Sequence, residues 1–313
     1  MGIRHAALLS PLVALPLAAP VAAGELDLSL VDAKAEVVFH ADVELLVQTK
    51  LFGLLSQAPE LGMADALAEF EEEIGLNPLE DVHSMTAYGL DADDEEDWVA
   101  LIHTSDRLDA ALDRLKSEEG YRQVEMGGRS VHSLKDGGET WFGYVFNSGD
   151  RSERLFLLSE DSGSLLRGVD VVEGSRPSVD EADEPSITSR PSPGSILFVS
   201  VGAGLSQLAE FDPAAEVSKL ISGFTLDAGE DEEMLFARVV LETPQHEDAL
   251  KVYQVIQGGI ALLGLIAGAD EELAPLTELA NALDIQRKGT LVTLQLRYPT
   301  AALLAMIEAV DED

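Results

Sequence analysis

The segment GLDADDEEDWVALIHTSDRLDAAL, residues 89–112, sets the plan of the chain. Carboxylates crowd residues 91–97, and an alternating apolar run begins directly after them at Trp98. A second segment, TLDAGEDEEMLFARVVLETPQHEDAL at residues 225–250, repeats the order of acidic turn, apolar strand and helix start. Two strands joined by a short polar segment are typical of a β-hairpin. Each acidic segment is therefore predicted to be the turn of a hairpin.

These two segments belong to a longer internal match. The stretch EVVFHADV at 36–43 aligns with SILFVSVG at 195–202. Within the two segments, Leu90 aligns with Leu226, Trp98 with Leu235 and Asp109 with Asp248, at offsets of 136, 137 and 139 residues. Self-similarity at a nearly fixed offset is the signature of a repeat. We therefore predict an internal duplication.

Periodicity predicts a mixed α+β fold. Helical spacing covers residues 51–74, where Gly75 and Pro78 end the helix, and a second helix covers 106–118 with Thr104 or Ser105 as its cap. Strand patterns cover 36–41, 82–90, 98–103, 122–126, 130–134, 140–146, 154–158, 195–201, 224–227 and 234–241. The order β-α-β-β-α-β predicts two similar halves, each a mostly antiparallel sheet of the split βαβ, ferredoxin-like type with helices on one face.

The amino-terminal residues predict export. Arg4 precedes an apolar run from Ala6 to Val21, and the small residues Val21 and Ala23 stand at the −3 and −1 positions of a cleavage site. We expect a signal peptide over residues 1–23, cleaved after Ala23, and a mature chain in the periplasm or outside the cell without a membrane span. The chain has no cysteine, so neither disulfides nor a lipidated cysteine are expected.

The mature chain divides into two predicted α+β repeats. They cover residues 24–173 and 195–313, and the segment GSRPSVDEADEPSITSRPSPG at 174–194 lies between them. That segment is rich in Pro, Ser and acid and has no apolar period, which is typical of a mobile linker.

The formal net charge of −38 and the pI near 4.2 oppose binding to nucleic acid or to anionic membranes. Phosphate recognition needs a basic face. The acidic balance indicates a solvated surface.

Several further features occur together in this chain: the predicted signal peptide, the duplication, the strand-to-helix entries VVFHADVELL and ILFVSVGAGL, and the passage GLNPLEDVHSMTAYG. On these features the chain resembles an uncharacterised family of exported bacterial proteins, a domain of unknown function. The resemblance implies no activity and no site residues.

Catalytic and cofactor motifs are missing from the sequence. There is no G-x-S-x-G elbow, no S-x-x-K, no H-E-x-x-H and no P-loop, and cysteine is absent as a nucleophile. An EF-hand loop starting at Asp91 would need Gly and Glu where Glu96 and Ile102 stand. A looser, weak calcium site in the acidic loops is the alternative to a solvated turn. No cofactor is expected.

The segment VYQVIQGGIALLGLIAG, residues 252–268, is the most apolar part of the mature chain. A helix that is apolar on most sides is usually buried, and we predict core here. The alternative is a ridge that meets a partner or an apolar ligand.

Four histidines suggest a transition-metal site. His40, His83, His103 and His132 fall on predicted strands, near strand ends that a split βαβ sheet would bring to one edge. Converging neutral imidazoles bind Zn²⁺ or Cu²⁺. The alternative is that each is a separate, half-buried strand residue.

Taken together, these features predict an exported, non-enzymatic binding or interaction protein of the cell envelope, with an unknown protein or apolar ligand as partner. A carrier of lipid or another apolar ligand is the alternative. A carboxylate-based hydrolase and a metal-binding protein are further candidates.

Overall fold

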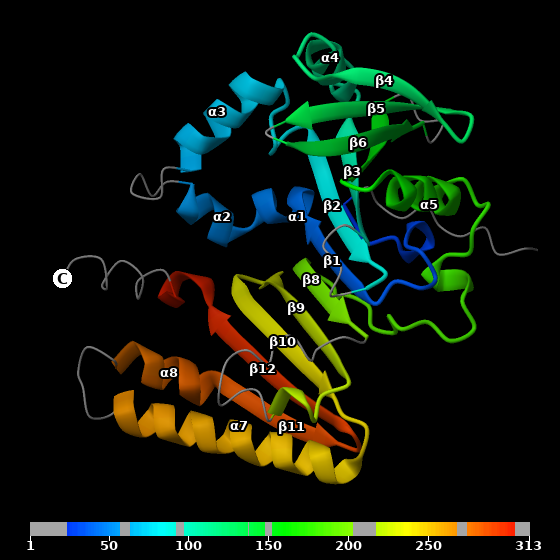
Figure 1. The fold of residues 1–313 in the computed structure, drawn as a ribbon. Coiled ribbons are helices and arrows are strands. Elements are labelled where there is room, and N and C mark those ends of the chain that lie inside the picture. The colour runs from blue at the N-terminus through cyan, green and yellow to red at the C-terminus, as the bar shows by residue number, and fades with distance from the viewer. Residues whose placement is uncertain are drawn as a thin grey trace, which may run out of the picture.

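The computed structural model describes residues 24–56, 63–91, 97–136, 138–147, 152–202, 217–267 and 274–303. The predicted signal peptide lies outside these residues. The fold is α+β, with one large antiparallel sheet and several helices (Figure 1). Among the described helices, none is long and apolar enough to span a bilayer.

The sheet has twelve strands in the order β11-β12-β10-β9-β8-β1-β2-β3-β7-β6-β5-β4. The strands before the 174–194 segment are β1 (Val37–Asp42), β2 (Val82–Gly89), β3 (Trp98–Ser105), β4 (Arg122–Met126), β5 (Arg129–Asp136), β6 (Glu139–Phe146) and β7 (Glu153–Ser159). The strands after it are β8 (Ser195–Val201), β9 (Gly223–Asp231), β10 (Met234–Glu242), β11 (Leu283–Lys288) and β12 (Leu291–Pro299). Nearly every strand predicted from alternation is confirmed within two residues of its bounds, and β9 is longer than predicted.

The sheet differs from the split βαβ arrangement expected for each half. There, the first and third strands would be neighbours, whereas β1 lies between β2 and β8 and pairs antiparallel with both. The β1–β8 pairing joins both halves in one continuous sheet. Val38 on β1 and Phe198 on β8 are fully buried, because central strands whose faces are covered by other elements bury their apolar side chains.

The helices cover both faces of the sheet, not one face as expected. On one face, α5 (Ser162–Val172) packs Leu165 and Val169 into the main core with Tyr88 and Val99. On the opposite face, α4 (Leu108–Leu115) packs on β6 and β7 through Leu108 and Leu112. Both faces of the central strands carry apolar residues, so both require cover.

The helical stretch after β1 is broken into three parts. These are α1 (Val43–Gln48), capped by Asp42, α2 (Lys50–Leu55), capped by Thr49, and α3 (Met63–Ile74). The single predicted helix over 51–74 is therefore only partly right. Within the predicted range, α2 ends at Leu55 and α3 begins at Met63, while Thr49 separates α1 from α2 because its side chain caps the new helix. The predicted stop is confirmed, since Gly75 has φ 83°, a left-handed conformation that suits glycine.

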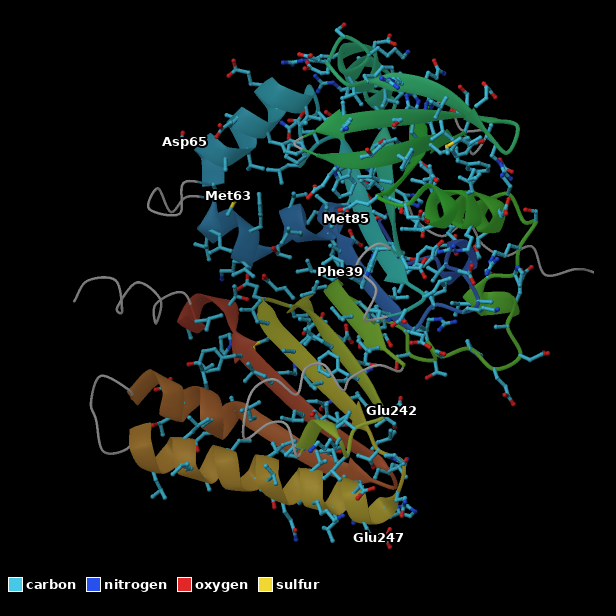
Figure 2. The ribbon with its side chains drawn as sticks, in the orientation of Figure 1. Phe39, Met63, Asp65, Met85, Glu242 and Glu247 are labelled. Carbon is cyan, nitrogen blue, oxygen red and sulfur yellow. The ribbon has the colours of Figure 1, made fainter. Side chains whose placement is uncertain are left out.

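A long helix covers the outer strands of the second half. The helix α7 (His246–Ala267) buries Ala249 and Val252 against Leu241 and Val292 of the sheet, and α8 (Ala274–Ala282) follows it. Figure 1 shows α7 along one margin of the molecule, and Figure 2 labels Glu247 in its first turn. In the same view, Phe39 and Met85 lie near the middle of the molecule, on β1 and β2.

The segment 174–194 is fixed to the fold, so its prediction as a mobile linker is wrong. Val179 and Ile187 have exposed fractions of 1% and 0% and belong to the main core. Ser178 forms a β-bridge with Asp32, and the hydroxyl of Ser192 donates to the buried Asp227. Val179 and Ile187 are isolated apolar residues in a polar stretch, so no hydrophobic periodicity in the sequence indicates that they anchor it.

Candidate functional site

His40 is a fully bonded core histidine. Its Nε2 donates to the Gly24 carbonyl at 3.1 Å, since a carbonyl only accepts. The neutral ring then accepts at Nδ1 from the Thr86 hydroxyl, at 2.9 Å. Burial, with a smaller contribution from His103, lowers the pKa of His40 to about 4, although the hydrogen bond to the Gly24 carbonyl acts in the opposite direction. Both ring nitrogens are thus engaged by protein atoms.

The other three candidate metal ligands have different surroundings. His83 Nδ1 lies 2.6 Å from Glu44 Oε1, and His132 Nδ1 lies 2.8 Å from the hydroxyl of Tyr121. Burial lowers the pKa of both His103 and His132. Within the described residues, no group of three or more His, Asp or Glu side chains is placed to hold a metal ion. The expected gathering of all four histidines is therefore not seen.

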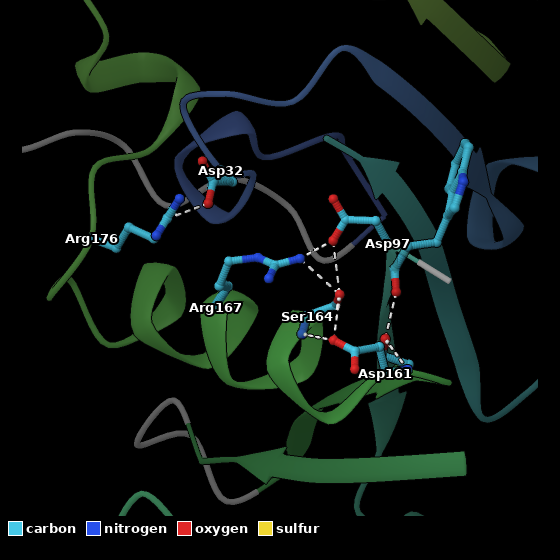
Figure 3. A network of polar contacts seen from close by, with 8 residues as sticks. Asp32, Asp97, Asp161, Ser164, Arg167 and Arg176 are labelled. Atoms are coloured by element: carbon cyan, nitrogen blue, oxygen red, sulfur yellow. Dashed lines mark hydrogen bonds and ion pairs between the residues drawn. The ribbon is translucent and has the colours of Figure 1, made fainter. Parts of the chain in front are cut away.

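A polar cavity of about 420 Å³ lies between α5 and the start of β3. Figure 3 shows its charged network. Arg167 donates to Asp97 and to the Ser164 hydroxyl oxygen. The single hydroxyl proton of Ser164 lies within reach of two acceptors, Asp97 at 2.8 Å and Asp161, the N-cap of α5, at 3.0 Å. The residues that line the cavity are Lys34, Leu90, Asp97, Asp161, Ser164, Arg167 and Arg176.

The carboxylates of this network are already engaged inside the protein. The buried Asp32, which is 1% exposed, pairs with Nε of Arg176, a residue 144 positions later in the sequence. Asp32 also accepts from the main-chain amide of Lys34 at 2.9 Å. A buried carboxylate is stable only with such partners. The Arg176–Asp32 pair thus holds the 174–194 segment against the core.

Beneath this network lies the phenol of Tyr88, 2% exposed and without a hydrogen-bond partner in the described part of the chain. Burial raises the pKa of Tyr88, and the charge of Asp32 raises it further. The glycine at 168 makes room for the ring, because a Cβ there would stand 3.2 Å from the Tyr88 hydroxyl oxygen. The tyrosine is a core residue that sequence reasoning did not single out.

A second cavity, of about 310 Å³, opens on the outer strands of the second half. Arg238, Arg297 and Asp231 line it together with Phe236 and Gln295. Arg297 is 3.2 Å from Asp231, and Arg238 lies 3.9 Å from the buried Asp227. Its lining is mixed, because these charged side chains share it with the apolar residues Pro193, Phe236, Ala237 and Leu296.

The largest departure from the sequence prediction is the outward side of α7. The predicted core segment 252–268 does bury Val252, but Leu265 is 74% exposed, Leu262 is 56% exposed and Val255 is 54% exposed. Large apolar side chains gathered on one exposed helix face mark an interaction surface. Hydrophobicity alone predicted burial here, whereas a helix that covers a sheet on one side buries only that side.

Comparisons with known proteins give no family and no curated relative, since no family model and no curated protein matches the sequence. Among solved structures, the chain is similar to TP0453. Crystal form III of TP0453 has 10% sequence identity and a TM-score of 0.49, covering 91% of this chain and 98% of that chain. Crystal form I has 11% identity and a TM-score of 0.46, covering 91% of this chain and 97% of that chain.

Proposed function

We propose that this chain is an exported binding protein that holds a partner protein through the outward side of α7 and carries out no chemistry of its own. The observation that carries the proposal is the exposure of Leu265, Leu262 and Val255, each more than half accessible to solvent. Fully burying a side chain of this kind is worth about 1.5–3 kcal/mol, and these three still expose more than half of their surface to water. A partner that covers them recovers part of that free energy.

The spacing of the exposed residues suits a helical partner. Val255, Gly258, Leu262 and Leu265 follow one another at intervals of three, four and three residues, the spacing of the a and d positions of a coiled coil. We call these four residues the α7 seam. A Cβ added at Gly258 would meet nothing within 4 Å, so the helix backbone is open to close approach there. The seam therefore fits one face of an amphipathic helix.

The charge of the protein selects the kind of partner. The net charge is −38, so two copies of this chain repel each other at long range. An amphipathic helix with basic flanks is instead attracted to the surface and oriented by it. We therefore assign the seam to a basic helical segment of another protein and not to a second copy.

The lipid-carrier alternative has less support. A carrier encloses its ligand in a largely apolar cavity. In the described part of the chain, the cavity beside α5 is lined mainly by charged and polar residues such as Lys34, Arg167 and Arg176, and the cavity on the outer strands of the second half mixes Arg238 and Arg297 with Phe236 and Leu296. Nucleic acid is opposed by the net charge.

The duplication is proposed on the same terms. Each half begins with three consecutive antiparallel neighbours, β1-β2-β3 in the first half and β8-β9-β10 in the second. A helix follows the third strand in both halves, and the last strand of each half lies beside that third strand. In the first half, β7 pairs with β3, and in the second half, β12 pairs with β10. This common order supports two related halves.

Site-specific photocrosslinking in the native envelope tests the docking surface. We expect a photoreactive residue at Leu262 or Leu265 to crosslink one basic protein, with the crosslinked peptide falling in an amphipathic helix. The same probe at Gln257, exposed but on another side of α7, should give little of that product.

A variant pair completes the test. Leu262→Glu with Leu265→Glu should abolish copurification of the crosslinked protein, while Leu291→Glu, a change at an exposed leucine on β12, should leave it intact. Crosslinks to a second copy or to lipid, or equal yields at positions 257 and 262, would contradict the proposal.

A further inference from the structure

A buried carboxylate stands without a cation at the end of β1. Asp42 is 8% exposed, and its Oδ1 accepts from the Leu45 amide at 2.8 Å as the N-cap of α1. Burial raises the pKa of Asp42, and the negative charges of Glu44 and Glu25 raise it further. Among the described residues, no basic side chain forms an ion pair with it. A buried carboxylate in this position is destabilising unless a positive group joins it.

Gly24 lies directly against this carboxylate. A Cβ at Gly24 would stand 2.6 Å from Asp42 Oδ1 and 2.9 Å from Oδ2, so the two residues are in contact and only glycine fits without movement. The carbonyl of Gly24 accepts from His40 Nε2 at 3.1 Å, which fixes the main chain at this point. Gly24 is also the residue that follows the predicted cleavage site.

We propose that Asp42 is the docking site for the α-ammonium group that forms at Gly24 when the leader is removed. This inference rests on the export that is part of the proposed function. A leader peptidase uses one water molecule to break the Ala23–Gly24 peptide bond. Ala23 keeps the new carboxylate, and Gly24 takes the protons that make its nitrogen an ammonium. Because cleavage accompanies export and precedes folding, the burial of Gly24 does not block it.

The consequence is a coupling between maturation and stability. Before cleavage, the nitrogen of Gly24 is a neutral amide, and Asp42 is a buried charge with no counterion. After cleavage, a positive group is covalently attached to the residue that touches the carboxylate. An opposite charge at this range favours the ionised carboxylate and the ionised amine together. The processed chain is thus more stable than the precursor.

A double-mutant cycle on purified full-length mature chains tests the pairing without any export step. The two parent proteins begin at Gly24 and at Ala23, so that the ammonium is either at the site or about 3.8 Å further along the chain. We expect Asp42→Asn to lower the melting temperature by about 2–4 °C in the chain that begins at Gly24, and by much less in the chain that begins at Ala23. Asp65→Asn, at an exposed aspartate, should act alike in both.

Titration of the terminal amine gives a second measurement that does not depend on the variant folding well. In the chain that begins at Gly24, the α-amino pKa should lie above its usual range of about 7.7–8.0. An equal effect of Asp42→Asn in both parents, or an α-amino pKa within the usual range, overturns the pairing. Intact-mass measurement of the exported protein tests export separately, because a start other than Gly24 contradicts the cleavage and leaves the cycle unaffected.

Discussion

The burial of His40 links the stability of the fold to pH. Its folded pKa is about 4, against 6.5 for the free side chain, so the folded state resists protonation of the ring. A depressed folded pKa contributes stability that is present above pH 6.5 and is lost as the pH falls from 6.5 to about 4. Below both values, the loss amounts to roughly 3 kcal/mol.

We therefore expect the stability advantage of the wild type over His40→Gln to be greatest near pH 7.5 and to shrink by roughly 3 kcal/mol by pH 4. Urea denaturation of both proteins across this range measures the difference. His246→Gln is the matched control, because His246 is exposed on α7. A difference between wild type and His40→Gln that stays constant with pH would contradict the burial of a neutral ring.

Single residues of the candidate site were the hardest to predict. The histidines attract attention in a sequence, yet the two buried carboxylates that anchor segment 174–194, Asp32 and Asp227, look like any other acid among 58. Their partners, Arg176 and Ser192, are 144 and 35 residues away. Such pairs depend on tertiary contacts, and no local pattern encodes them.

At the scale of elements, alternation predicted most strands because one face of each is buried. The helix α5 was missed, since its first turn reads Ser-Gly-Ser, three residues of modest or poor helix propensity. Its cap, Asp161, and the spacing of Leu165 and Val169 were the signals that could have found it. The joining of both halves through β1 and β8 was not predictable, because any apolar strand is a suitable neighbour for another.

The β9–β10 hairpin confirms one of the two predicted acidic turns; the corresponding residues 92–96 lie outside the described residues. Its two turn residues, Glu232 and Glu233, have φ of 51° and 63°. A two-residue turn with positive φ at both positions favours Asn-Gly. We expect Glu232→Asn with Glu233→Gly to raise the free energy of unfolding by about 1 kcal/mol, measured by urea denaturation.

The change also removes the ion pair between Glu233 and Lys50, at 2.7 Å. Both side chains are exposed, so the pair contributes little. Lys50→Ala alone controls for it and should alter stability by less than about 0.5 kcal/mol. A double variant no more stable than the wild type would show that these glutamates are not strained.

At the scale of the whole molecule, the excess of acid governs both association and stability. The sequence has 58 acidic against 20 basic residues. Basic side chains such as Arg167 and Arg176 are already paired with carboxylates, and the acids outnumber them, so the outer surface is largely negative. Composition was sufficient to predict this property, because net charge does not depend on the fold. The repulsion between negative charges that opposes self-association also destabilises the folded state.

Low salt should therefore destabilise the folded state. The screening length is about 30 Å at 0.01 M ionic strength and about 10 Å at 0.1 M, so repulsion across the surface is strong only in dilute salt. We expect the melting temperature at pH 7 to rise by several degrees between 10 mM and 200 mM NaCl, a range in which sodium chloride acts mainly by screening. The control is the same series near pH 4.5, close to the pI of 4.2, where the net charge is small and the slope should be much flatter. Equal slopes at the two pH values would mean that salt acts through something other than self-repulsion, and a flat series at pH 7 would mean that the acidic surface does not limit stability.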